Sequence, residues 1–404
     1  MVFRTKQHCK DPTIEFLNLF KRPLSDSIPK YMSETFPGKT IAYCARARTG
    51  IHEAIDILGI GQGDHVLVPA FNCGSEIDPI LVSKAELTLY PVELTTFINP
   101  DEIASRIQEN TKAIYIIHYF GFPQPEMARI SELAKAKGIP IIEDCALSLF
   151  SKTADNNIEN GCDFSVYCFY KYYPVIAGGA LVSKHPDLAN RFTKPFPKNL
   201  ARKTLVSSIL QRLLGDRLSR LLIDRLKKIL RGNQHPAQVT KTTSRPDMPA
   251  DYYFDPIFSH ARINSLTKRL LFTYNPLDMV EIRRRNFNLV LKGIKDIEAA
   301  TPLFQSLPEG VCPLSFPILV SNQQSICNAL NDARIDATPW WSGYHSGVDW
   351  SDQDAASFLK DNLISLPIHQ YLKPEQINYM VETLKNLLQS TQSRAVEFSD
   401  RKVA

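Results

Sequence analysis

The sequence predicts an α/β protein in which a mostly parallel sheet of the seven-stranded type, with helices on both faces, precedes a smaller α+β C-terminal domain. Short apolar runs, typical of buried strands, alternate with stretches of helical periodicity from about residue 41 to residue 185. The chain has 404 residues, 44% of them hydrophobic, which is enough for two domains. We expect an N-terminal arm over 1–40, a large domain over 41–260, and a linking helix with the small domain over 261–404.

The elements of the large domain follow from these patterns in order. Residues 13–20 predict a short helix in an otherwise irregular arm. Apolar runs predict strands at 65–71, 86–94, 112–121, 139–144, 166–174 and 178–184. Helical spacing between them predicts helices at 48–58, 77–82, 101–109 and 127–138. Such alternation is typical of right-handed crossovers in a parallel sheet.

The second half of the chain changes in character. A basic helical insertion is expected over about 200–232, followed by a polar link over 232–256. A long helix predicted over 263–297 leads into the small domain. There we expect a strand at 314–320 and helices at 323–335 and 374–390, with a frayed charged tail after Ser393.

The positive charge of the chain is concentrated in one segment. The net charge is +5, but residues 198–231 hold ten basic and two acidic side chains, so this segment carries +8 and the remainder about −3. The bulk of the protein therefore lacks the basic surface typical of nucleic-acid binding. Within the segment, residues 206–230 predict an amphipathic helix that either packs on the large domain or across a dimer, or binds anionic lipid at the inner face of a membrane.

Composition also bears on location and metal binding. No stretch approaches the roughly 18 apolar residues of a membrane span, and the N-terminus lacks the apolar core of a signal peptide. The eight cysteines form no CxxC pair and no metal-ligand spacing. We expect a cytoplasmic protein with reduced thiols and no metal site.

Two side chains carry the clearest chemistry. The apolar run 139–142 ends in an acidic pair that includes Asp144, which predicts a carboxylate at the carboxyl edge of the sheet. Lys171 follows among aromatic residues, just before Gly178 and Gly179. Each alone has an ordinary interpretation, a helix cap for the acid and a surface position for the lysine. Together they supply what pyridoxal phosphate (PLP) requires, a partner for the pyridinium nitrogen and an amine for a Schiff base.

These motifs resemble the DegT/DnrJ/StrS family of PLP-dependent sugar aminotransferases, which have PLP fold type I. The resemblance covers about 41–388, interrupted by the basic insertion. The stretches that carry it are "RTGIHEAIDILGIGQGDHVLVPAF", "LYPVEL", "KAIYIIHYFGFPQPEMARISELAKAKGIPIIEDCA", "FYKYYPVIAGGALVSK" and "SLPIHQYL". It implies transfer of an amino group from an amino acid, commonly glutamate, to a keto sugar carried on a nucleotide. It also implies a homodimer with active sites at the subunit interface.

The resemblance assigns roles to cofactor-binding positions. Lys171 matches the Schiff-base lysine, which can also move the proton in the 1,3-shift, and Asp144 matches the partner of the ring nitrogen. Arg48 and Thr49 match the phosphate-binding turn at a helix start, and we favour this role over a simple helix cap for Thr49. Cys73 falls at the position that stacks on the cofactor ring.

Three positions depart from the family pattern. Leu147 stands where the family has Gln or His to contact the phenolic oxygen of the cofactor. Cys168, with Ser165 as the other candidate, is nearest to the serine that precedes the lysine. His260 stands where an asparagine reaches the phosphate in the partner subunit, and a matching Arg262 follows it.

Other residues are expected to face the substrate. His118 matches a family position at a strand end, where a structural role is equally expected. In the small domain the candidates are Trp341, His345 and His369, whereas Trp340 favours the core.

Two alternatives to a sugar aminotransferase stay open. One is a transaminase of a non-sugar ketone or aldehyde, and the other a membrane-peripheral or regulatory protein that retains the fold. The presence of both Lys171 and Asp144 argues against the second. It also argues against the family's dehydratases, which replace the lysine.

Overall fold

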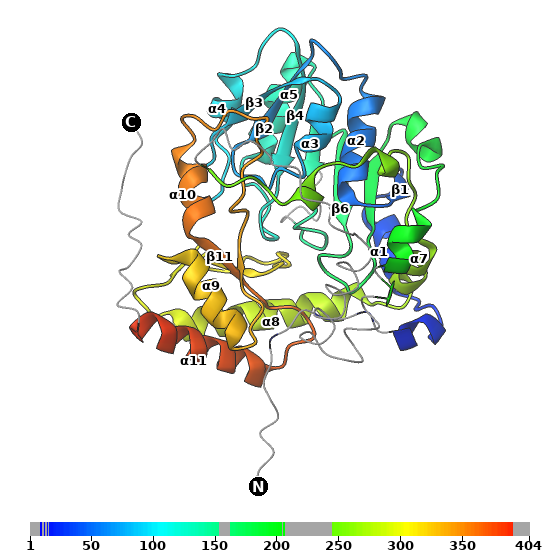
Figure 1. Ribbon diagram of the computed structural model, residues 1–404. Coiled ribbons are helices and arrows are strands. Elements are labelled where there is room, and N and C mark those ends of the chain that lie inside the picture. Colours follow the sequence, from blue (N-terminus) through cyan, green and yellow to red (C-terminus); the bar gives the residue numbers. More distant parts are fainter. Residues whose placement is uncertain are drawn as a thin grey trace, which may run out of the picture.

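The large sheet has seven strands in the order β1-β7-β6-β5-β4-β2-β3 (Figure 1). The computed structural model describes residues 16–152, 162–203 and 245–390, with the single positions 9, 12, 14, 205 and 206. The strands are β1 (Thr40–Cys44), β2 (His65–Pro69), β3 (Glu86–Tyr90), β4 (Thr111–Ile117), β5 (Ile141–Asp144), β6 (Phe164–Cys168) and β7 (Gly179–Ser183). Strands β2 to β6 are parallel, and β7 is antiparallel to its neighbours β6 and β1. This is the mostly parallel sheet that the sequence predicts.

Strands β2, β5, β6 and β7 are buried along their whole length, which explains their continuous apolar runs. The helices that connect them are α2 (Ala47–Ile57), α3 (Asp78–Val82), α4 (Pro100–Ala104) and α5 (Met127–Lys137). Helix α4 is shorter than the predicted 101–109. The Thr111 hydroxyl accepts a 2.8 Å hydrogen bond from the main-chain amide of Gln108, so the chain already turns toward β4 there.

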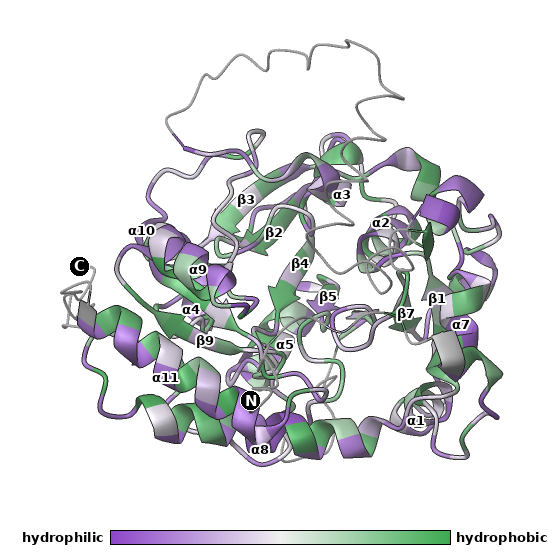
Figure 2. Ribbon diagram, turned by 60° about the horizontal axis from the view of Figure 1, so that its bottom comes forward, coloured by the Kyte–Doolittle hydropathy of each residue, from purple (hydrophilic) through white to green (hydrophobic). Residues whose placement is uncertain are grey.

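The small domain is built on a four-stranded antiparallel sheet in the order β10-β11-β9-β8. Its strands are β8 (Thr301–Pro302), β9 (Phe316–Leu319), β10 (Thr338–Pro339) and β11 (Leu363–Leu366), and its helices are α9 (Gln323–Asp332), α10 (Asp354–Asn362) and α11 (Pro374–Ser390). Helix α11 packs along the linking helix α8 (Pro276–Ile294), as both views show (Figures 1 and 2). In Figure 2 these two helices alternate between hydrophobic and hydrophilic residues, as expected for helices with one buried face.

The single helix predicted over 263–297 is wrong, because the structure has α7 (Ser265–Leu271) followed by α8. Pro276 disfavours the helical conformation in the residue before it and cannot donate a helical hydrogen bond. Asn275 instead caps α8, since its side chain accepts a 2.9 Å hydrogen bond from the amide of Leu277. The arm also contains an unpredicted helix, α1 (Ile28–Thr35).

Helix α8 ties the two sheets together through Arg283, which is fully buried. Its guanidinium donates to the main-chain oxygen of Leu314 at 2.6 Å and to the Gln370 side chain at 2.9 Å. Gln370 in turn donates to the main-chain oxygen of Tyr172 at 2.8 Å. The turn that follows β6 is therefore held by residues of the small domain.

The predicted amphipathic segment 206–230, apart from the exposed Val206, lies outside the described residues. Its alternative roles in packing and in peripheral membrane contact stay predictions. Among the described helices, none combines the length and the apolar character that crossing a bilayer requires.

Candidate active site

Several strands end at one edge of the large sheet and bring their following loops together. Strands β2, β5 and β6 are parallel, so their carboxyl ends share this edge. Strand β1 also ends there, because it is antiparallel to β7, which is itself antiparallel to β6. The loops after β2 and β6 and the start of α2 border a cavity of about 370 Å³.

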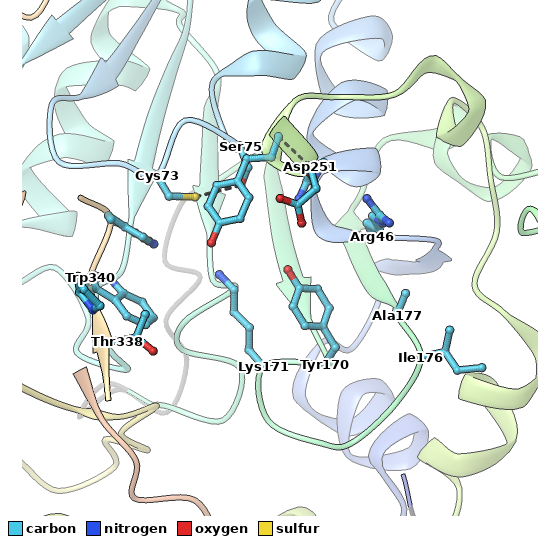
Figure 3. Close-up of a pocket in the computed structure, with 14 residues that line it drawn as sticks. Arg46, Cys73, Ser75, Tyr170, Lys171, Ile176, Ala177, Asp251, Thr338 and Trp340 are labelled. Carbon is cyan, nitrogen blue, oxygen red and sulfur yellow. Dashed lines mark hydrogen bonds between the residues drawn. The ribbon is translucent and has the colours of Figure 1, made fainter. Parts of the chain in front are cut away.

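The cavity is lined by residues of both sheets (Figure 3). From the large sheet and its loops come Arg46, Arg48, Cys73, Ser75, Tyr170, Lys171, Ile176 and Ala177. The segment before α7 contributes Asp251 and Tyr252, and the small sheet contributes Thr338, Pro339, Trp340 and Trp341. The side chain of Lys171 points into the cavity between Tyr170 and the Trp340 side of the wall (Figure 3).

Lys171 is half-buried and projects from a tight turn after β6. The amides of Tyr172 and Tyr173 both donate to the main-chain oxygen of Phe169, at 3.0 and 2.9 Å, and this turn exposes Lys171 to the cavity. Among the described residues, its Nζ has no hydrogen-bond partner. Burial acts to lower the pKa of Lys171, but the neighbouring Tyr170, Cys168 and Asp144 outweigh it, so the pKa is raised.

Asp144 is the last residue of β5 and is only 3% exposed. Its Oδ1 accepts a 2.8 Å hydrogen bond from the amide of Ala146, and its Oδ2 accepts a 2.7 Å hydrogen bond from the hydroxyl of Tyr115. Burial, followed by the charge of Asp144, raises the pKa of Tyr115, so the phenol stays a donor. Tyr115 was not predicted as a site residue, although a tyrosine in a mostly buried apolar strand needs a hydrogen-bond partner.

A second carboxylate, Glu76, was also missed. It lies in the loop after β2, where it is buried and accepts hydrogen bonds from the Cys73 thiol at 2.8 Å and from the Cys73 amide at 3.2 Å. Burial raises the pKa of Glu76, and the nearby Asp144 adds to this while Lys171 opposes it. Burial and Glu76 also raise the pKa of Cys73, so the position predicted to stack on the ring holds a neutral thiol.

The start of α2 forms the third side of the site. The Arg48 guanidinium donates to the main-chain oxygens of three consecutive residues, Asp251, Tyr252 and Tyr253, at 2.8, 2.6 and 3.2 Å. Thr49 is fully buried, and its hydroxyl has no hydrogen-bond partner among the described residues. It does not line the cavity in this structure, so its expected role toward a phosphate stays a prediction.

Gly179 allows this helix start to approach the sheet closely. A Cβ at this position would lie 2.5 Å from the main-chain oxygen of Tyr167 and 2.9 Å from the amide of Ala47. The double glycine of the sequence therefore brings the first turn of α2 against β7, beside the loop that carries Lys171.

Four of the predicted residues, Lys171, Arg48, Cys73 and Trp341, line the cavity, and Asp144 lies buried at the same sheet edge. The remaining cofactor candidates do not line it. Cys168 is fully buried, and burial is the main cause of its raised pKa. The Nδ1–H of His260 donates to the carboxylate of Glu53 in its own chain at 2.9 Å, and Arg262 is exposed beside Cys44 at the end of β1.

The three histidines expected to face substrate are buried away from the cavity wall. His118 Nδ1 accepts a 3.0 Å hydrogen bond from the amide of Gln124, which favours its structural interpretation. His345 pairs with Asp78 at 2.8 Å, and its Nδ1 accepts from the amide of Gly347, so Nε2 carries the proton. His369 lies in the loop after β11, 6.0 Å from the ring of Tyr371. None of this was visible in the sequence, because each partner is a long-range contact or lies in a loop.

The model of the DegT/DnrJ/EryC1/StrS aminotransferase family matches residues 38–204 of the chain. The matched stretch contains Asp144, Lys171, the start of α2 and the whole seven-stranded sheet. The family resemblance predicted from the sequence is confirmed over these residues.

Solved structures share the fold over most of both chains. The Helicobacter pylori aminotransferase PseC, involved in the biosynthesis of pseudoaminic acid, has 15% identity and a TM-score of 0.66, over 95% of this chain and 99% of that one. The aminotransferase TlmJ from Streptoalloteichus hindustanus has 16% identity and a TM-score of 0.65, over 89% of each chain. The E. coli GDP-4-keto-6-deoxy-D-mannose-3-dehydratase, solved with hydrated PLP, has 16% identity and a TM-score of 0.63, over 88% of this chain and 90% of that one. These similarities confirm the predicted fold class.

Proposed function

We propose, from this family match and the geometry of the cavity, that the chain is a PLP-dependent aminotransferase that moves an amino group from an amino acid to a keto sugar. The observation that carries the proposal is the placement of Lys171 in the cavity with Asp144 buried at the same sheet edge. Two of the similar structures are of a dehydratase, GDP-4-keto-6-deoxymannose-3-dehydratase. Because the resemblance implies that dehydratases lack the lysine, Lys171 favours amino transfer.

The residues present fit PLP on three sides. Lys171 has an amine without a hydrogen-bond partner among the described residues, and the Asp144 oxygens keep lone pairs for a pyridinium N–H. The unpartnered hydroxyl of Thr49, at the start of an 11-residue helix, suits a phosphate. Leu147 offers no polar atom beyond its main chain, whose oxygen already accepts from the Tyr172 hydroxyl at 2.6 Å. The contact to the phenolic oxygen therefore needs another residue.

In this proposal, side chains of the protein move and hold the protons of the reaction. PLP, when bound, supplies the electron sink for the electron pair left at the donor carbon. With PLP in place, the Lys171 Nζ would accept the proton from that carbon and return it to the carbon at the other end of the 1,3-shift. The Asp144 carboxylate would bind the N–H of the ring nitrogen, and the Tyr115 hydroxyl holds Asp144 in position.

The acceptor side of the cavity is aromatic. Trp340 and Trp341 stack on each other with ring centroids 5.5 Å apart, and both line the cavity. Indole faces suit a sugar ring or a nucleotide base. This supports a keto sugar as acceptor, with a nucleotide-linked form and glutamate as donor proposed from the family resemblance.

We also infer that the protein is a homodimer. Tyr170 borders the cavity and is 45% exposed, and Arg262 is exposed beside the end of β1. A second subunit covering this side would enclose the cavity and let His260 and Arg262 reach the neighbouring site, as the resemblance implies.

Borohydride trapping tests the cofactor assignment. The protein is incubated with PLP and reduced, and its peptides are analysed by mass spectrometry. We expect the adduct on Lys171 and none in Lys171→Ala, while Lys152→Ala, a half-buried lysine outside the cavity, keeps it. An adduct absent from the wild-type protein would overturn the proposal.

A substrate panel tests the reaction. Glutamate is supplied with keto-nucleotide sugars, free keto sugars and simple ketones, and the products are weighed by mass spectrometry. Amination of a sugar supports the proposal. Amination of simple ketones alone would establish the non-sugar alternative, and a trapped cofactor without amination of any acceptor would favour a non-catalytic role.

A further inference from the structure

Lys360 of α10 is fully buried and binds only main-chain oxygens. Its Nζ donates to Asn72 at 2.6 Å, to Trp341 at 2.8 Å and to Gly343 at 2.8 Å. No carboxylate lies within ion-pairing distance of this Nζ in the part of the chain that the structure describes. The rings of Tyr344 and Trp350 instead pack 5.0 and 4.9 Å from the ammonium.

The three carbonyls belong to two loops, one from each sheet, that meet beside the cavity. Asn72 directly precedes Cys73 in the loop after β2, whereas Trp341 follows β10 in the small sheet. The rings of Phe71 and Trp341 already meet across this junction, 5.2 Å apart. One ammonium group therefore joins the wall from the large sheet to the wall from the small sheet.

The main chain of Trp341 needs such support. Its φ is +56°, a left-handed conformation that is costly for a residue with a bulky side chain. The bonds from Lys360 to the carbonyls of Trp341 and Gly343 fix the peptide planes on either side of this turn. Without them, a relaxed turn would carry the Trp341 indole away from its place on the cavity wall.

We propose that Lys360 is a positioning residue whose ammonium holds the indole of Trp341 in place on the cavity wall, against the loop that carries Cys73, and thereby shapes the acceptor side of the cavity. Its effect on acceptor binding rests on the proposed aminotransferase function. Its effect on the conformation of the Trp341 turn does not.

Protonation of Lys360 is sensitive to pH near neutrality. Burial lowers its pKa to about 7, although Cys73, Glu76 and Asp361 act in the opposite direction. The other titratable groups close by are Tyr344, beneath the ammonium, and His345, which pairs with Asp78. Loss of the proton leaves the amine with too few hydrogens for three carbonyls, so we expect the turn to loosen as the pH rises.

Intrinsic fluorescence reports on this turn directly, because the only three tryptophans of the chain are Trp340, Trp341 and Trp350. In the wild-type protein we expect one change in emission with pH, with a midpoint near 7. Lys360→Met should lack this transition and show greater acrylamide quenching at pH 6. Lys360→Arg, always charged, should also lack the transition but keep across the whole range the emission that the wild-type protein shows at pH 6. His345→Gln should keep the transition, which separates the lysine from the imidazole.

Kinetics supply the second measurement, with circular dichroism as the check on folding. In Lys360→Met we expect the acceptor KM to rise about tenfold, the effect of one charge-assisted hydrogen bond. The rate of the half-reaction with the amino donor should stay within about twofold, below any effect expected from a lost hydrogen bond. Lys373→Met, an exposed lysine of the same domain, is the matched control and should change neither value.

The outcomes separate this inference from the proposed function. Unchanged emission and KM in a folded Lys360→Met protein, or a transition that His345→Gln abolishes, would overturn it. If the wild-type protein transfers no amino group, the fluorescence experiment still decides whether Lys360 holds the turn.

Discussion

The carboxylate of Asp144 is held by two donors that differ in kind, the main-chain amide of Ala146 and the hydroxyl of Tyr115. The amide belongs to the backbone turn after β5 and is present whatever the side chains are. The hydroxyl comes from the neighbouring strand β4. At the scale of single residues, Tyr115 is therefore the only side chain among the described residues that holds the acid proposed to face the cofactor, and it can be changed by mutation.

Tyr115→Phe tests this role. Loss of a hydrogen bond to a charged group should lower the unfolding free energy by about 1.5–3 kcal/mol. The Asp144 carboxylate then keeps only one of its two donors and is less fixed, so kcat should fall about tenfold, which corresponds to about 1.4 kcal/mol in the barrier. Urea unfolding and steady-state kinetics measure the two effects.

Tyr90→Phe is the matched control. This residue is equally buried, but its hydroxyl donates to the main-chain oxygen of Tyr115 at 2.6 Å and does not touch Asp144. We expect a stability loss of about 1 kcal/mol with unchanged kcat. A similar fall in kcat in both variants would show that strand packing, and not the hydrogen bond to Asp144, is responsible.

The lowered pKa of Lys360 makes a prediction about stability. From about pH 7 to 10.5 the unfolded chain holds this proton while the folded chain has lost it. The unfolding free energy from this group therefore rises with pH through that window, by up to about 5 kcal/mol at full titration. Urea unfolding of the wild-type protein and of Lys360→Met is measured at pH 6.5, 8 and 9.5. The unfolding free energy of the wild type minus that of the variant should increase from each pH to the next. If this difference in unfolding free energy is the same at all three pH values, the pKa of Lys360 is not lowered in the folded protein.

At the scale of elements, the close contact between α2 and β7 depends on Gly179. Gly179→Ala places a Cβ against two main-chain groups, which should cost about 1–3 kcal/mol and displace the start of α2. We expect weaker PLP binding in an equilibrium titration together with the lower stability. Gly61→Ala has no neighbour closer than 3.7 Å and should stay within about 0.5 kcal/mol of the wild type. Normal PLP affinity in a folded Gly179→Ala protein would show that the close contact between α2 and β7 does not contribute to cofactor binding.

The elements that the sequence predicts well are those whose signal is local. Neighbouring residues alone suffice to predict the buried strand that ends in Asp144 and the aromatic turn that carries Lys171. The break before α8 was missed because the apolar spacing continues across Pro276, although the proline itself marks it. Glu76 and Lys360 were missed for a different reason, since their roles depend on contacts with loops that only the folded chain brings near.

At the scale of the whole molecule, the open side of the cavity predicts concentration-dependent activity. A homodimer should sediment at twice the mass of the chain, and dilution below its dissociation constant should lower the amino-transfer rate per subunit. Arg262→Ala should weaken PLP binding without changing the fold of its own subunit, because this residue is exposed there. A fully active monomer would exclude a shared site.

The bond between Lys360 and Asn72 joins positions 288 residues apart, and Cys9 pairs with Ile335. On the ribosome, these N-terminal segments emerge long before their partners. The seven strands of the large sheet lie within residues 40–183, so the sheet can form early. The wall of the cavity that contains Trp341 is completed only when α10, which carries Lys360, has been made. A nascent or truncated chain would thus present Lys171 in an incomplete site, so we expect the proposed cofactor to bind only after the whole chain has been made and folded.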